Sequence, residues 1–206
     1  MATEAPTRSS ARERLLAAAD ELFYAEGVHT VGIDRIIERA GVAKASLYST
    51  FGSKDGLIRA YLEGRQQERT ERITRGLTRF DAPRERLLGV FDVLADATRT
   101  PTFRGCAFIN ASGESPRGGV VEDVADSSRA WIRELFIRLA DEAGARDPDQ
   151  LGRQLAMLYD GATVAAKMDR NPKAAALARA AAEVILDAAI TAPAAARRSR
   201  KPPTKR

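Results

Sequence analysis

The 206-residue sequence contains one cysteine, Cys106, and one histidine, His29. A single cysteine cannot form an intrachain disulfide, and so few Cys and His side chains give no spacing that would hold a metal ion. A lone histidine without a visible nucleophile beside it also gives poor support for His-based catalysis. We therefore predict no metal site, no cofactor and no catalytic residues.

Long apolar runs are missing as well. No run approaches the roughly 20 residues that span a bilayer, and the first residues contain no apolar segment typical of a secretory signal. We expect a cytoplasmic protein that has no membrane partner. Period-two alternation is also missing, whereas glycines and prolines divide the chain into segments of helical periodicity. This pattern predicts an all-α fold.

The net charge of +5 is concentrated at one end of the chain. The last ten residues, RRSRKPPTKR, carry six basic side chains and no acidic ones, so the remainder has a charge of 5 − 6 = −1. The basic isoelectric point therefore reflects the tail rather than a binding face. From residue 192 onward Ala, Pro and basic residues cannot form a core, and we predict a disordered basic tail over residues 192–206. This tail could add nonspecific DNA affinity or simply aid solubility.

Four helical segments are predicted in the first third of the chain. Apolar residues recur at helical spacing over Ser10–Glu26 and Ile33–Ala40, and Gly27 and Gly41 follow as helix ends. Only three residues separate the second segment from the third, Lys44–Phe51. A fourth helix begins after Ser53, a suitable N-cap. Its continuation over residues 63–76 is so polar that we expect a solvated connector between two bodies.

Two short helices joined by a tight glycine turn outline a helix-turn-helix unit. If Leu47 and Phe51 face inward, five residues of the third helix face outward and could approach base edges: Lys44, Ala45, Ser46, Ser49 and Thr50. Gly32, at the start of the second helix, offers free amides to a phosphate, and Tyr48 and Lys54 could also contact phosphates. The same spacing is compatible with a small helical core that binds no DNA.

The segment Arg12–Leu62 resembles the N-terminal domain of the TetR family of bacterial transcriptional regulators. The resemblance covers about a quarter of the chain, as a composite pattern of high specificity. The matching residues are Gly27, Ile36, Ala40, Gly41, Val42, Leu47, Tyr48, Phe51, Lys54 and Leu57. The chain departs from the pattern at four positions, namely Gly32, Ile37, Ala43 and Thr50, which bear on DNA affinity and phosphate contacts rather than on the fold.

The resemblance implies that different segments of the chain have different functions. It implies a flexible N-terminal arm over residues 1–9, a helix-turn-helix domain over 10–62, and a helical ligand-binding and dimerisation domain over 63–191. The further helices expected there from the residue pattern are Arg84–Ala97, Arg104–Glu114, Val120–Ala143, Pro148–Arg170 and Pro172–Ile190.

Candidate residues for a ligand pocket are apolar or aromatic side chains near a few polar groups. They are Phe91, Cys106, Phe108, Asn110, Trp131, Met157, Asp160 and Thr163. Each could equally be core, and Cys106 could be a buried hydrophobe, a pocket wall or a redox sensor. The last two helices are rich in alanine, and the resemblance implies a dimer interface along the stripe Leu177, Ala181, Val184 and Ala188.

We therefore predict a homodimeric, ligand-responsive transcriptional regulator, mainly a repressor, that binds a pseudo-palindromic double-stranded DNA operator and is released by a small-molecule effector. Two alternatives stay open: a DNA-binding protein without an effector, and an enzyme on an all-α scaffold. No nucleophile–base–orienter set or phosphate-binding glycine loop favours the enzyme.

Overall fold

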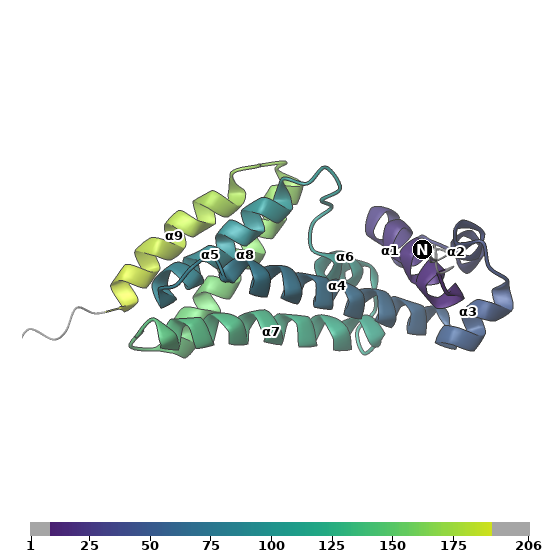
Figure 1. Ribbon diagram of the computed structural model, residues 1–206, viewed down its shortest axis with the longest axis horizontal. Coiled ribbons are helices and arrows are strands. Elements are labelled where there is room, and N and C mark those ends of the chain that lie inside the picture. The colour runs from purple at the N-terminus through teal and green to yellow at the C-terminus, as the bar shows by residue number, and fades with distance from the viewer. Residues whose placement is uncertain (1–8, 191–206) are drawn as a thin grey trace, which may run out of the picture.

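The structure is a computed structural model that describes residues 9–190, and every regular element in that range is an α-helix (Figure 1). The all-α prediction is therefore confirmed. The helices are α1 (Ala11–Glu26), α2 (Ile33–Ala40), α3 (Lys44–Phe51), α4 (Lys54–Leu77), α5 (Pro83–Thr98), α6 (Ala107–Glu114), α7 (Val120–Glu142), α8 (Pro148–Met168) and α9 (Ala174–Ala189). The predicted tail over 192–206 and most of the predicted arm over 1–9 lie outside the described residues.

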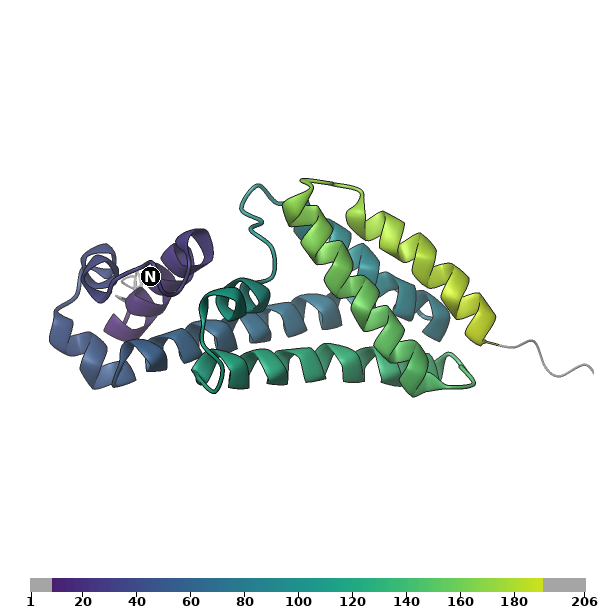
Figure 2. The ribbon, with the colours of Figure 1, turned by 180° about the vertical axis from the view of Figure 1, so that it is seen from behind.

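The helices form an elongated molecule (Figures 1 and 2). Helices α1, α2 and α3, the N-terminal head, lie at one end, and α5, α8 and α9 lie at the other. The 24-residue helix α4 joins the two ends, and α7 packs along it. No helix among the described residues is both long and apolar enough to cross a membrane.

Local sequence signals set most of the helix boundaries. Ser10 and Glu13 form a reciprocal capping box at the start of α1. The Ser53 hydroxyl accepts a hydrogen bond from the Gly56 amide (3.0 Å) and caps α4. Gly41 ends α2 in the left-handed conformation, with φ of 62°, which a residue without a Cβ adopts at little cost. The predicted bounds of α2 and α3 match the observed ones.

Two predicted helix starts differ from the structure by more than one residue. Helix α6 begins at Ala107 rather than at Arg104, because the Tyr24 hydroxyl accepts a hydrogen bond from the Arg104 amide and donates one to the Gly105 carbonyl (both 2.9 Å). These contacts keep residues 104–105 out of the helix, and Gly105 forms a bend with φ of 91°. Helix α9 begins at Ala174 rather than at Pro172, after a turn that the Asn171 side chain stabilises.

Two hydrophobic clusters support the elongated shape. One lies at the α5/α8/α9 end and continues along α7. The other joins the head and the start of α4 to α6 and the first turns of α7, through Phe108, Ala111, Val121 and Val124. The predicted domain division at residue 62 stays a prediction, and packing across it is continuous. Elements from the second half of the chain therefore support the head directly.

The segment over residues 63–76 does join the two ends of the molecule, but the prediction that it is solvated holds only in part. Ile73 is buried in the larger cluster, and the side chains of Arg65 and Arg69 are half-buried against neighbouring helices. The polar residues of this segment suggested exposure to solvent, whereas these arginines are oriented toward the protein interior. Their surroundings form the cavity described below.

A second glycine is required where α3 meets α4. A Cβ at Gly56 would overlap the backbone carbonyl oxygen of Phe51, the last residue of α3. Gly64, farther along the same helix, faces open space. The close approach of the end of α3 to the first turn of α4 therefore depends on Gly56.

Candidate DNA-binding face and ligand cavity

Helix α3 is held by few buried contacts and exposes most of its surface. Leu47 is fully buried, and Phe51 packs partly against the same cluster. Lys44, Ala45, Tyr48, Ser49 and Thr50 are exposed, and Ser46 is half-buried. The exposed face therefore consists of small and polar side chains on a rigid support, a surface suited to a DNA groove.

Two of the predicted base-contacting hydroxyls have an acceptor within the helix. The Ser46 carbonyl accepts hydrogen bonds from Ser49 Oγ (3.2 Å) and from Thr50 Oγ1 (2.6 Å). Their hydroxyl oxygens can still accept hydrogen bonds, whereas donation to DNA requires a change of rotamer.

Lys44 has a partner that the sequence analysis missed. Its Nζ donates to Asp34 Oδ1 of α2 at 2.9 Å, and the pair is exposed (55% for Lys44, 82% for Asp34). The hydrogen bond to Asp34, aided by its charge, raises the pKa of Lys44. Lys44 is therefore firmly cationic, and it must exchange Asp34 for DNA to contact a base.

The candidate phosphate contacts differ in character. Gly32 is an exposed N-cap without a side-chain hydrogen bond, and nothing lies within 4 Å of the position of a Cβ there. The first amides of α2 are thus open to an anion. Tyr48, on α3, is 45% exposed. Lys54 is half-buried, with Nζ 3.4 Å from the His29 carbonyl, and burial lowers its pKa. Lys54 thus also connects α4 to the turn after α1.

A cavity of about 310 Å³ lies between the head and the α5/α8/α9 end. Four of the residues that line it were predicted from the sequence: Cys106, Phe108, Asp160 and Thr163. Burial raises the pKa of Asp160, against the opposing charges of Arg129 and Arg69. Leu94 and Phe103 add apolar surface.

The other four residues predicted for the pocket lie outside the lining. Phe91 is buried in the larger cluster against Phe136 and Tyr159. Trp131 lies on the far side of Arg69, with the guanidinium carbon 5.6 Å from its ring centroid.

Asn110 and Met157 are excluded for different reasons. The Asn110 side chain donates to the Arg104 carbonyl and accepts from Lys167 Nζ, so it closes the outside of the loop before α6. Met157 is 65% exposed on the outer face of α8. Periodicity identified an apolar residue there but could not tell which of two faces it occupies.

The sequence analysis missed the polar wall of the cavity. Arg65, Glu68, Arg69 and Arg72 of α4 line it together with Tyr24 of α1. The three arginines recur at i, i+4 and i+7, which places them on one face of the helix. That spacing is the signal that could have found them.

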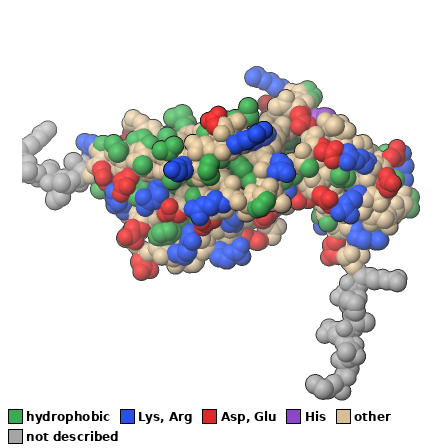
Figure 3. Space-filling model, turned by 90° about the horizontal axis from the view of Figure 1, so that it is seen from above, with side chains coloured by type: hydrophobic (Ala, Val, Ile, Leu, Met, Phe, Trp, Pro, Cys, Tyr) green, Lys and Arg blue, Asp and Glu red, His purple; other side chains and the backbone are tan. Residues whose placement is uncertain are grey.

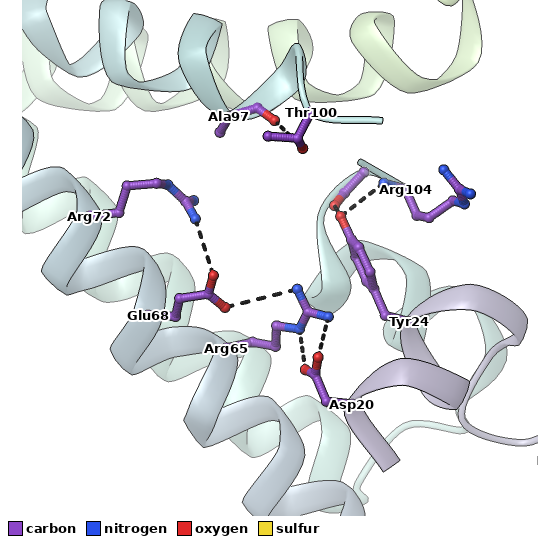
Figure 4. A network of polar contacts seen from close by, with 9 residues as sticks. Asp20, Tyr24, Arg65, Glu68, Arg72, Ala97, Thr100 and Arg104 are labelled. Atoms are coloured by element: carbon purple, nitrogen blue, oxygen red, sulfur yellow. Dashed lines mark hydrogen bonds and ion pairs between the residues drawn. The ribbon is translucent and has the colours of Figure 1, made fainter. Parts of the chain in front are cut away.

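The head contacts the cavity wall through a network of polar groups (Figure 4). Asp20 of α1 binds the Arg65 guanidinium at 2.5 and 2.8 Å, and that guanidinium lies over the Tyr24 ring (3.9 Å to the centroid). The Tyr24 hydroxyl contacts the chain at Arg104 and Gly105. The cavity wall and α1 are therefore joined by direct contacts.

A further contact joins α6 to the turn after α1. The His29 amide donates to Glu114 Oε2 (3.2 Å), and the His29 ring lies 2.9 Å from the Ser115 hydroxyl. The end of α6 thus fixes the base of the head. Among residues 9–190, no group of three or more His, Cys, Asp or Glu side chains could hold a metal ion.

Helices α8 and α9 lie side by side (Figure 2), and both carry exposed apolar side chains. On α9, Leu177 (62% exposed) and Val184 (70%) alternate with exposed Ala181 and Ala188. On α8 the large exposed apolar side chains are Met157, Val164 and Met168. Hydrophobic side chains gather over this end of the molecule in the space-filling view (Figure 3).

Comparison with known proteins matches both halves of the chain. Residues 15–61 match the family model of bacterial regulatory proteins of the tetR family, and residues 83–182 match the tetracyclin repressor-like C-terminal domain. The structure is similar to that of a TetR-family transcriptional regulator from Streptomyces coelicolor, with 36% identity and a TM-score of 0.83. That alignment covers 89% of this chain and 91% of the other.

Two named regulators are also similar. The reduced form of Escherichia coli NemR has a TM-score of 0.76 and 25% identity, over 89% of this chain and 98% of NemR. In sequence, the transcriptional repressor NemR is 27% identical over 177 residues, 80% of this chain and 88% of NemR. The transcriptional activator FasR of Mycolicibacterium smegmatis is 35% identical over 89 residues, which is 43% of this chain and only 41% of FasR.

The helix-turn-helix head, the all-α fold and a TetR-family relative aligned over nine-tenths of its length lead to the same assignment. This chain belongs to the TetR family and is a DNA-binding transcriptional regulator.

Proposed function

We propose that the protein represses transcription as a homodimer that binds a pseudo-palindromic operator and leaves it when a small molecule occupies the cavity. The observation that carries this proposal is the exposed polar face of α3, which is held on a buried Leu47 at one end of the molecule. In the proposed complex α3 enters the major groove, where Lys44, Ala45, Ser46, Ser49 and Thr50 face the bases.

The contacts proposed for the phosphates lie around α3. They are the amides at Gly32, the Tyr48 hydroxyl and the Lys54 ammonium. Such contacts position a protein on the duplex and carry no sequence information by themselves.

The apolar face of α8 and α9 supports the proposed dimer. Monomeric proteins rarely leave contiguous apolar surface of this kind in water. The same face on a second copy would cover it, because a two-fold interface is self-complementary. Leu177, Ala181, Val184 and Ala188 would lie in this interface, and we now add Met157 of α8.

An effector response requires a route from the cavity to the head. Tyr24 belongs to both, since it lines the cavity and is part of α1. A ligand that displaces Arg65 from Asp20, or Tyr24 from the 104–105 segment, would change the orientation of the head relative to α4. A coupling of about 2 kcal/mol would change operator affinity about thirtyfold.

Repression rather than activation is supported by the extent of the similarity. The repressor NemR aligns with 80% of the chain, whereas the activator FasR aligns with 43%. The cavity disfavours the alternative of a regulator without an effector.

Selection of random duplex DNA with the purified full-length protein at near-physiological salt tests this function. We expect one inverted repeat to be enriched. Lys44→Ala is expected to change the selected bases, whereas Tyr48→Phe and Lys54→Ala weaken binding to all duplexes alike. Failure to enrich any sequence, together with binding that merely disappears as salt rises, would refute specific DNA recognition.

A further inference from the structure

The charges around the cavity do not balance. Arg65 is neutralised by Asp20, and Asp160 pairs with Arg129 (3.0 Å), although neither Asp20 nor Arg129 lines the cavity. The charged side chains that remain on the lining are Arg69, Arg72 and Glu68, one acid against two guanidinium groups. The cavity therefore carries an excess of one positive charge.

Arg69 is half-buried, and its hydrogen-bond partners among residues 9–190 are all neutral. Its Nη2 donates to Gln66 Oε1 (2.7 Å) and to the carbonyl and hydroxyl oxygens of Ser128 (2.9 and 2.7 Å). Its guanidinium lies near the rings of Phe108 (5.2 Å) and Trp131 (5.6 Å), which hold it in place. Its Nε is buried without an acceptor.

Arg72, one turn farther along α4, makes fewer hydrogen bonds than Arg69. Its closest carboxylate, Glu68, is 3.9 Å away, which is too far for a hydrogen bond, and Glu68 itself is 64% exposed (Figure 4). The Arg72 Nε is also buried without an acceptor in the described part of the chain. Both guanidinium groups therefore line the cavity without a carboxylate at hydrogen-bond distance, and an added anion would supply one.

The remaining walls restrict the kind of anion. Leu94, Phe103 and Phe108 provide apolar surface, and a volume of about 310 Å³ is at the small end of ligand pockets. An excess of one positive charge fits a monoanion better than a dianion. A planar carboxylate also matches the paired N–H groups of a guanidinium.

We propose that the cavity binds a small organic monocarboxylate, with its carboxylate on Arg69 and Arg72 and its apolar part against Leu94, Phe103 and Phe108. This inference rests on the proposed effector response and names the chemical class of the effector. Residues Arg69 and Arg72 lie one turn apart on α4, the helix that carries the head, so the ligand would act on that helix directly.

The test compares simple carboxylates with their uncharged counterparts. The full-length protein is titrated with hexanoate and cyclohexanecarboxylate, with the primary amide of each, and with inorganic phosphate. Binding is followed by the emission of Trp131, the one tryptophan of the chain, and by the shift in the midpoint of thermal unfolding. We expect the carboxylates to bind saturably and their amides to bind at least about tenfold more weakly.

Two variants locate the anion site. Arg72→Gln is expected to weaken carboxylate binding about tenfold or more, because a charge-assisted hydrogen bond is lost. The Arg72 side chain makes no hydrogen bond in the described residues, so this variant should fold. The control, Arg75→Gln, makes the same charge change at an exposed position of α4 and should leave affinity within about twofold. Arg69→Lys is a second variant. It keeps the positive charge and removes the paired N–H groups of the guanidinium.

Three results would overturn the inference: equal binding of acids and amides, tighter binding of phosphate than of any carboxylate, or equal affinities in wild type and Arg72→Gln. The same samples are assayed for release of the selected DNA. Carboxylate binding that depends on Arg72 but leaves DNA affinity unchanged would support the site and refute the effector response. Release by an uncharged compound, independent of Arg72, would support the response and refute the carboxylate.

Discussion

The ion pair between Lys44 and Asp34 leads to a prediction with an unusual sign, since removing one partner's charge should strengthen DNA binding. Asp34 holds the Lys44 ammonium at 2.9 Å and adds a negative charge beside the face proposed to approach phosphates. Asp34→Asn removes that charge and preserves the shape of the side chain. Less free energy is then needed to separate Lys44 from residue 34 so that it can contact DNA.

The size of the expected gain in DNA affinity follows from the exposure of the Lys44–Asp34 pair. Exposed ion pairs are weak, so releasing Lys44 should raise affinity only modestly, by up to about fivefold. Removing a charge that lies within about 8 Å of phosphates adds to this, and we expect a total gain between about twofold and about tenfold. The gain should shrink as salt is raised, because both contributions are electrostatic.

The stability of the protein should fall in Asp34→Asn, whereas its DNA affinity should rise. Asp34 lies in the first turn of α2, where a carboxylate interacts favourably with the helix dipole. Asp34→Asn should therefore lower the free energy of unfolding, by about 0.3–1 kcal/mol. Tighter DNA binding by a less stable protein would separate the two roles of this residue.

The assay is a titration of a labelled selected duplex, read by fluorescence anisotropy at several salt concentrations. Glu38→Gln is the matched control, because it removes one negative charge from an exposed position on the same helix without breaking the pair. If Asp34→Asn binds no more tightly than wild type, or if Glu38→Gln tightens binding equally, Asp34 does not compete with DNA for Lys44.

The remaining predictions concern the dimer, the head and the route between them. Leu177 is 62% exposed, so Leu177→Ala should cost about 1 kcal/mol per copy and weaken the dimer roughly thirtyfold in sedimentation, whereas Ile109→Ala on α6 should leave it unchanged. Gly56→Ala should lower the free energy of unfolding by about 1–3 kcal/mol in a denaturant titration, because the added Cβ overlaps a backbone carbonyl. Gly64→Ala, on the same helix, should raise it by about 0.5–1 kcal/mol, and a loss there would contradict the steric argument. Tyr24→Phe should reduce the effector-induced change in DNA affinity while DNA affinity without effector stays near that of wild type; an unchanged response would remove Tyr24 from the route.

The sequence predicted the head well because its signals are local. Gly27 and Gly41 end their helices, and Leu47 and Phe51 are spaced to bury one side of a short helix. Each of these features involves residues a few positions apart. The bounds of α2 and α3 and the exposed side of α3 could therefore be deduced without the structure.

The cavity could not be predicted in the same way because its walls meet through long-range packing. The residues around Arg69 are polar, and polarity alone does not tell whether a helix face meets water or an interior cavity. The answer depends on Ser128 of α7 and Phe108 of α6, far away in the chain. The start of α6 likewise depends on a hydroxyl of Tyr24, 80 positions away from Arg104. No local pattern encodes such contacts.

The most direct test of a dimeric DNA-binding regulator varies the spacing between the two half-sites of the selected inverted repeat. Two α3 helices in a fixed dimer can contact both half-sites only at one separation and on one face of the duplex. Inserting about 5 base pairs, half a helical turn, should reduce affinity to that of a duplex with a single half-site. Affinity that stays the same at every spacing would show that the two heads bind independently, and would contradict the account of a rigid dimer joined through α8 and α9.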